Sequence, residues 1–157
     1  MSDRFYASLE IGGPISGDLV PALAAQISNA GFLFPGESLE QHINDDGLLA
    51  VEDEQAPYGE FPELEGWLQE HGIEFNRHSS GYFDLLPEWV SFRRRQGRIV
   101  HLLDGQGDQV ISHQDVARAL AECNTLAALQ AALTELLGPT VPPLQPININ
   151  PKEEAQP

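Results

Sequence analysis

The sequence has few cations, and this shortage excludes several classes of partner. Its 157 residues include 8 Lys and Arg against 24 Asp and Glu, which gives a net charge of −16. Nucleic acids and anionic membranes bind proteins through cations that neutralise phosphates, and such an acidic surface repels both. We therefore expect no direct binding to nucleic acid or to a membrane, and a basic protein is the favoured partner.

Cysteine and long apolar runs are also scarce. Cys123 is the only cysteine, so no internal disulfide can form, which fits a reducing compartment. The first residues lack the basic and apolar regions of a secretory signal, and no apolar run approaches the roughly 20 residues of a membrane-spanning helix. We expect a soluble cytoplasmic protein, with a hydrophobic content of 41% that suits a folded core.

Recognised catalytic and cofactor motifs are missing as well. The glycine-rich turn at 12–17 has neither the spacing of a dinucleotide loop nor the lysine of a P-loop, and no G-x-S-x-G occurs. The DGQGD run at 104–108 lacks the calcium-loop pattern, and a tight turn explains it. No histidine lies in HExxH spacing. The sequence therefore predicts no catalytic residue, no metal site and no cofactor; the histidines are His42, His71, His78, His101 and His113.

The charge that is present is concentrated in one part of the chain. Between Glu37 and Glu88, here called the acidic segment, fourteen carboxylates face one cation, Arg77, for a local charge of −13. A surface built only for solubility mixes both signs and settles near a net charge of about 2 to 8. We therefore predict a partner-binding surface, although a merely solvated face is the alternative. The candidate partner-binding residues are Asp45, Asp46, Glu52, Asp53, Glu54, Glu60, Glu63 and Glu65.

Four arginines follow the acidic segment. Pairing with carboxylates on neighbouring strands is the favoured interpretation, because opposite charges across a sheet attract. Strand alternation also sends Arg94 to the face opposite Arg93 and Arg95, so these residues form no single phosphate-binding patch. The fourth arginine is Arg98.

The order of predicted elements indicates an α+β fold. Residues 1–138 are expected to form one domain, with a mostly antiparallel sheet and helices packed on one face. The proline-rich tail, residues 139–157, is predicted to be flexible and to form no hydrogen-bonded strand. The predicted strands are 4–11, 48–51, 73–76, 82–86, 89–95, 98–103 and 109–111, and the helices run from about 16 to 30, 62 to 72, 112 to 122 and 125 to 137.

One segment carries a resemblance. Residues 63–95, ELEGWLQEHGIEFNRHSSGYFDLLPEWVSFRRR, resemble small acidic accessory proteins of bacterial plasmids and phages. The resemblance covers about a fifth of the chain and implies an accessory protein of a mobile element that blocks a host defence enzyme. No functional residue is carried over from it.

Three hypotheses for the function follow. The first is a non-enzymatic interaction protein that occupies a basic, nucleic-acid-binding surface of a partner protein; an inhibitor or immunity protein against a nuclease has the same electrostatics. The second is a small metal-dependent or acid–base enzyme that uses carboxylates and a histidine such as His78 or His101. In the third, the acidity serves only solubility. The oligomeric state is not predicted.

Overall fold

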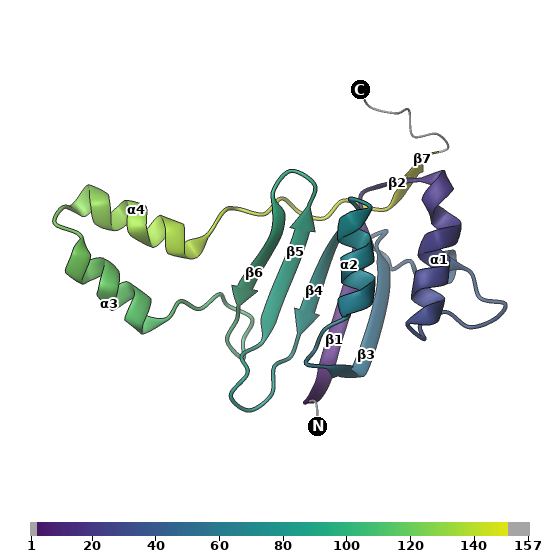
Figure 1. Ribbon diagram of the computed structural model, residues 1–157, viewed down its shortest axis with the longest axis horizontal. Helices are drawn as coiled ribbons and strands as arrows, with labels where there is room; N and C mark the ends of the chain where they lie inside the picture. Colours follow the sequence, from purple (N-terminus) through teal and green to yellow (C-terminus); the bar gives the residue numbers. More distant parts are fainter. Residues whose placement is uncertain (1–2, 151–157) are drawn as a thin grey trace.

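The fold is built around a five-stranded antiparallel sheet, in which β1 (Arg4–Gly12) is the second strand (Figure 1). The computed structural model describes residues 3–150. The strand order is β3-β1-β4-β5-β6. Every pair of neighbouring strands in this sheet is antiparallel. The other four strands are β3 (Leu49–Pro57), β4 (Glu74–Ser79), β5 (Glu88–Arg93) and β6 (Gly97–Leu102).

Two helices cover one face of this sheet. They are α1 (Val20–Asn29), which follows a 3-10 turn at Gly17–Leu19, and α2 (Pro62–Glu70). Each has a proline in its first turn, where the missing N–H costs little. Their buried side chains meet the inward-facing residues of the sheet in a single hydrophobic core. The predicted α+β fold with an antiparallel sheet is confirmed; the core includes Leu9, Ile11, Leu23, Ile27, Leu64, Leu68, Phe75 and Val90.

The remaining helices, α3 (His113–Glu122) and α4 (Leu126–Leu137), form a helical hairpin that projects beyond β6 (Figure 1). Their predicted starts are confirmed. The Ser112 hydroxyl accepts the N–H of Gln114 at 3.2 Å, and the Thr125 hydroxyl accepts the N–H of Ala128 at 3.1 Å. The sequence indicated both helices but not their projection from the sheet. No helix within residues 3–150 is long and apolar enough to span a membrane.

The segment after α4 returns along the end of the sheet as a strap, residues 139–147 (Figure 1). Beyond it, β7 (Asn148–Asn150) pairs in parallel with β2 (Pro14–Ser16). The Gly13 N–H donates to the Gln145 carbonyl at 2.8 Å. The prediction that this region forms no hydrogen-bonded strand is therefore wrong for residues 148–150, because their partner lies more than 130 residues earlier. Residues 151–157 of the predicted tail lie outside the described residues.

The strand pairing around β6 also differs from prediction. β6 pairs with β5 around the turn at 94–96, and Gln109 makes only an isolated bridge to Leu103. Residues 82–86 form a loop instead of a strand. The DGQGD run is a tight turn, as predicted, because the Asp104 carboxylate accepts two backbone N–H groups at 2.8 and 3.0 Å. These hydrogen bonds lower the pKa of Asp104.

Candidate functional site: an acidic sheet edge

Three of the eight predicted partner-binding residues lie on β3, the edge strand of the sheet. Glu52, Asp53 and Glu54 occupy its centre, where the register against β1 shifts between Phe5 and Ala7. Such a bulge bends the strand and re-aims its side chains. Glu52 and Glu54 are exposed and Asp53 is half-buried. Charged residues on an edge strand also oppose pairing with another sheet, so these three carboxylates serve the fold as well.

Four further carboxylates extend this row at both ends of β3. Asp45 and Asp46 are exposed in the turn before it, where the Asn44 side chain accepts the N–H of Asp46 at 3.0 Å. Glu60 and Glu63 are exposed just after it, and Glu63 lies in the first turn of α2. Together the seven residues form what we call the acidic edge: Asp45, Asp46, Glu52, Asp53, Glu54, Glu60 and Glu63.

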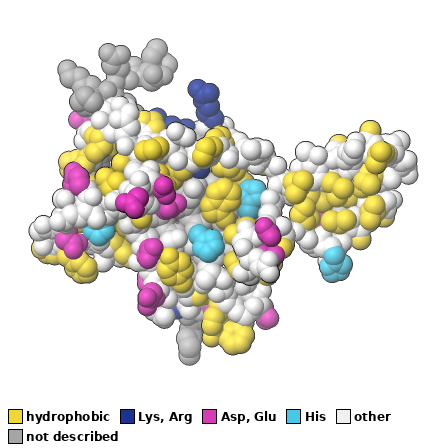
Figure 2. All heavy atoms as spheres, turned by 180° about the vertical axis from the view of Figure 1, so that it is seen from behind, with side chains coloured by type: hydrophobic (Ala, Val, Ile, Leu, Met, Phe, Trp, Pro, Cys, Tyr) yellow, Lys and Arg dark blue, Asp and Glu magenta, His cyan; other side chains and the backbone are white. Residues whose placement is uncertain are grey.

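The acidic edge has no ion-pair partner among residues 3–150, although the Arg4 guanidinium donates to the Gln55 carbonyl of β3 at 3.2 Å. Within residues 3–150, none of its seven carboxylates lies within 4.0 Å of a Lys, Arg or His side-chain nitrogen. Figure 2, which shows the sheet from behind, places several Asp and Glu side chains together over the β1 and β3 side. Unpaired charges of one sign along one edge add their fields and attract a basic surface.

Glu65 is the exception among the predicted residues, and its assignment to a partner-binding surface is wrong. It is only 5% exposed, because it lies on the face of α2 that meets the sheet. Its Oε1 lies 2.7 Å from Nε of Arg77, although off the line for a hydrogen bond, and accepts the N–H of Phe61 at 3.0 Å. Glu65 therefore holds the helix against the sheet.

Arg77, the one cation of the acidic segment, is fully buried beneath α2. It donates to Glu88 Oε1 at 2.6 Å and to the carbonyl of Gly59 at 2.8 Å. Arg98 comes within 3.9 Å of the second Glu65 oxygen. Burial removes the positive charge of Arg77 from the surface, so it does not screen the acidic edge.

Two of the four arginines that follow the acidic segment, Arg93 and Arg94, pair differently from the prediction. Arg93 is buried and donates to the carbonyls of Phe75 and Pro142 and to the Asn76 side chain, and burial lowers its pKa. Arg94 donates to the carbonyls of Gly72 and Pro14. The expected carboxylate pairs are therefore absent for these two residues within the described chain. Backbone carbonyls at strand ends take their place, and no sequence pattern marks such acceptors.

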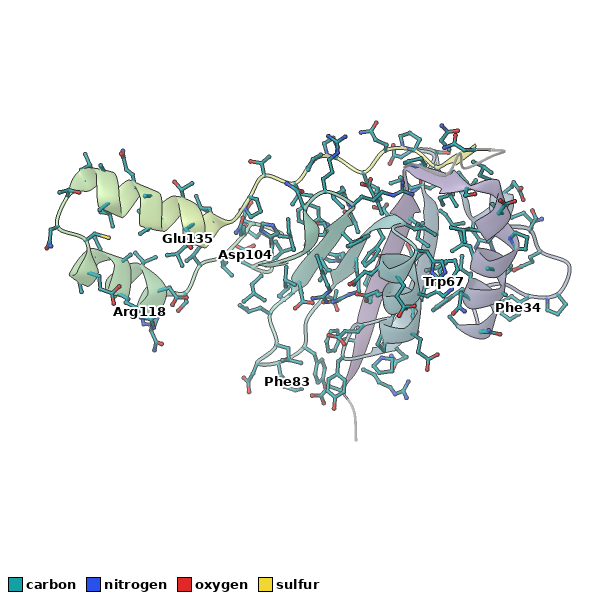
Figure 3. All side chains as sticks on the ribbon, turned by 45° about the horizontal axis from the view of Figure 1, so that its top comes forward. Phe34, Trp67, Phe83, Asp104, Arg118 and Glu135 are labelled. Carbon is teal, nitrogen blue, oxygen red and sulfur yellow. The ribbon has the colours of Figure 1, made fainter. Side chains whose placement is uncertain are left out.

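An apolar pocket of about 490 Å³ adjoins the acidic edge. Glu60 belongs to both features, and Asp84 and Glu88 add two more carboxylates to the pocket lining. The loop beside the pocket carries Phe83, which is 89% exposed with φ 49°, a conformation that is strained for a bulky side chain. Figure 3 shows Phe83 at the tip of this loop. The pocket is otherwise lined by Phe5, Tyr58, Ser79, Leu85, Leu86 and Leu102.

The histidines of the enzyme hypothesis lie on the opposite face of the sheet, which no helix covers. His78, Trp89 and His101 are consecutive partners across β4, β5 and β6. The two histidines are therefore two strands apart, about 10 Å, with the Trp89 ring between them. No group of three His, Cys, Asp or Glu suited to a metal occurs among the described residues.

Sequence reasoning missed the apolar pocket and the Arg77 network. The pocket is lined by residues from β1, the turn after β3, the loop at 82–86 and β6, which are far apart in the sequence. The only sequence signal was the group of apolar residues at 82–86, several of which are exposed in the structure. The signal for the network was a lone arginine in an acidic segment.

Comparisons with protein-family models, with curated proteins and with solved structures find no match for this chain. The resemblance to plasmid and phage proteins stays a prediction.

Proposed function

We propose that this protein is a non-enzymatic binding protein whose acidic edge occupies a basic, nucleic-acid-binding surface of a partner protein. One observation carries the proposal: three carboxylates on an edge strand and four in the segments that flank it form no ion pair in the described chain. The nine residues of β3 alone extend about 30 Å, the scale of a protein–nucleic acid contact. An inhibitor of a nuclease is the class of protein that this surface suits.

The apolar pocket gives the proposed interface an anchor. Charge complementarity speeds association and selects the partner, whereas buried apolar side chains at the centre of an interface supply most of the affinity. Because Glu60 lines the pocket, a basic surface on the acidic edge can insert an aromatic or aliphatic side chain beside it. The partner surface is therefore expected to carry arginines and lysines around one projecting apolar residue.

The test has two stages, identification of the partner and measurement of its charge dependence. The immobilised protein captures ligands from cells of its source, and mass spectrometry identifies proteins that elute with salt. Binding of the purified partner is then measured at about 50 and 200 mM salt. Affinity should fall as salt rises, because screening over about 8 Å weakens attraction between exposed charges. A short DNA duplex should compete for the same partner surface.

Charge reversals locate the contact. Asp45→Lys/Asp46→Lys and Glu52→Lys/Glu54→Lys should each weaken binding at least tenfold, mainly through slower association. The matched control is Glu122→Lys/Glu135→Lys, which makes the same change in net charge on the helical hairpin and should leave affinity within about twofold. Equal affinity in all variants, or binding that is flat with salt, would show that the acidic edge is not the working surface.

The solubility hypothesis makes a different prediction for the same variants. If the acidic edge only solvates the protein, the reversed variants lose solubility while every interaction persists. The exposed charges contribute little to stability, so all variants should unfold at nearly the wild-type urea concentration. Solubility, affinity and stability measured on one set of proteins therefore separate the two hypotheses.

A further inference from the structure

Within residues 3–150, no other element covers one apolar face of the helical hairpin. Of the residues in α3 and α4, only Ala119 is buried, and α4 has no buried residue. Leu120 is 60% exposed and Leu126 is 71% exposed. Two amphipathic helices become stable by burying their apolar stripes against a second layer, which this hairpin lacks. Helical periodicity collects Val116, Leu120, Leu126, Leu133 and Leu137 on this face.

The charges of the helical hairpin lie on its other side. Asp115 and Arg118 pair at 3.4 Å on α3, and with Glu122 and Glu135 they line the groove between the helices opposite the leucines. Figure 3 labels Arg118 and Glu135 there. Seen from behind in Figure 2, the helical hairpin shows a broad hydrophobic surface and no Asp, Glu, Lys or Arg. A partner can therefore cover this face without burying a charge.

We propose that the apolar face binds the same face of a second copy, so that two helical hairpins form a four-helix bundle around a two-fold axis. Such an interface is self-complementary, because the same uncharged layer is supplied twice. A basic partner is not favoured on this face, since none of the carboxylates that would attract it is there. A second hairpin has the matching length and width.

The exposed area and the distribution of charge both favour self-association. A compact monomer of this mass exposes about 7,800 Å², whereas this chain exposes 10,074 Å². The excess fits a hairpin that projects from the sheet with an uncovered face, and a standard interface buries roughly 800 Å² of each partner. Figure 1 shows the helical hairpin beyond β6, at the opposite edge of the sheet from β3, so the two-fold axis keeps the acidic edges of both copies apart. Mutual repulsion therefore opposes this dimer only weakly.

Sedimentation equilibrium on the full chain tests the proposal between about 1 and 300 µM. The wild type should reach about twice its 17.2 kDa mass. Leu120→Glu and Leu126→Glu each place a charge in the interface and should weaken dimerisation at least tenfold. Phe34→Glu is the matched control, since Phe34 is 64% exposed in a distant loop, and it should dimerise as the wild type does. A wild type that stays monomeric at 300 µM, or dimers equally tight in both leucine variants, would overturn the proposal.

A distance measurement fixes which faces meet. Cys123 is the single cysteine, and it lies in the charged groove, so a spin label there leaves the apolar face free. In a four-helix bundle the two labelled positions lie within about 30 Å, given helix spacings near 10 Å and a rise of 1.5 Å per residue. Separations well beyond 50 Å would exclude this interface. Salt should leave this dimer unchanged or tighten it, the opposite of its effect on the proposed basic partner.

Discussion

Replacing Arg77 with methionine should destabilise the protein by about 3–5 kcal/mol, the usual cost of removing one member of a buried ion pair. The substitution leaves the Glu65 carboxylate, 5% exposed, with only Arg98 at 3.9 Å as a counter-charge. It also leaves the Gly59 carbonyl without its 2.8 Å donor. Methionine fills most of the volume, so the loss reports on charge and hydrogen bonding more than on a cavity.

The reasoning predicts strong coupling between Arg77 and Glu65. Glu65→Gln alone should cost about 1–2 kcal/mol, because Arg77 keeps its 2.6 Å pair with Glu88. The double variant removes the isolated carboxylate as well as the arginine, so it should be more stable than Arg77→Met alone by about 1–3 kcal/mol. Glu88→Gln is the control: it removes a charge from the same arginine at a side chain that is 27% exposed, and should cost at most about 1 kcal/mol.

Urea denaturation monitored by tryptophan fluorescence measures these differences, since Trp67 on α2 and Trp89 on β5 flank the network. With a denaturant slope near 2 kcal/mol/M, Arg77→Met should lower the midpoint by about 2 M. Urea is preferred to guanidinium because it leaves ion pairs unscreened. Strictly additive losses in the double variant, or a cost below 1 kcal/mol for Arg77→Met, would refute the claim that this network holds α2 to the sheet.

Two further predictions concern the strap and its contact with β1. Truncation after Gly138 should lower the melting temperature by several degrees. It removes the acceptor of the Gly13 N–H, one acceptor of the buried Arg93 and the whole β2–β7 ladder. An unchanged transition in calorimetry would contradict this prediction. Gly12→Ala should destabilise by about 2 kcal/mol or more, because its Cβ would lie 2.2 Å from the Gln145 carbonyl. Gly66→Ala, within α2 and free of any neighbour inside 4 Å, should instead stabilise by about 0.5–1 kcal/mol in the same urea titration.

Local patterns predicted the elements that local chemistry determines. The alternation in β1, the prolines that open α1 and α2 and the hydroxyl caps of α3 and α4 are all signals within a few residues of the structure they specify. The clustering of acidic residues along the sequence singled out Glu52, Asp53 and Glu54, but the predicted strand, 48–51, ended before these residues, which lie within β3. Pairing over long separations left no such signal, so β7 was interpreted as part of an unpaired tail.

The errors at the candidate site have the same origin. Glu65 belongs to the acidic segment by sequence, but its position on α2 turns it toward Arg77. Which of two neighbouring carboxylates on a helix, Glu63 or Glu65, faces solvent depends on which side of the helix meets the sheet. The four arginines that follow the acidic segment were expected to pair with carboxylates, yet Arg93 donates to the carbonyl of Pro142, a residue 49 positions away.

The parallel pairing of β2 with β7 has a consequence for the order in which the protein is made. A ribosome adds about 5–20 residues per second, so roughly 7 to 27 s separate the synthesis of Pro14 from that of its partner Asn148. During that interval the nascent chain can form its β1, α1 and β3 contacts, but the Gly13 N–H lacks its acceptor in the strap and β2 lacks its partner β7. Bringing β7 next to β2 also closes a loop of more than 130 residues. The entropy of that closure is lost before any hydrogen bond between the two strands forms. The strand at Pro14–Ser16 is therefore completed only by residues that are synthesised more than 130 positions later.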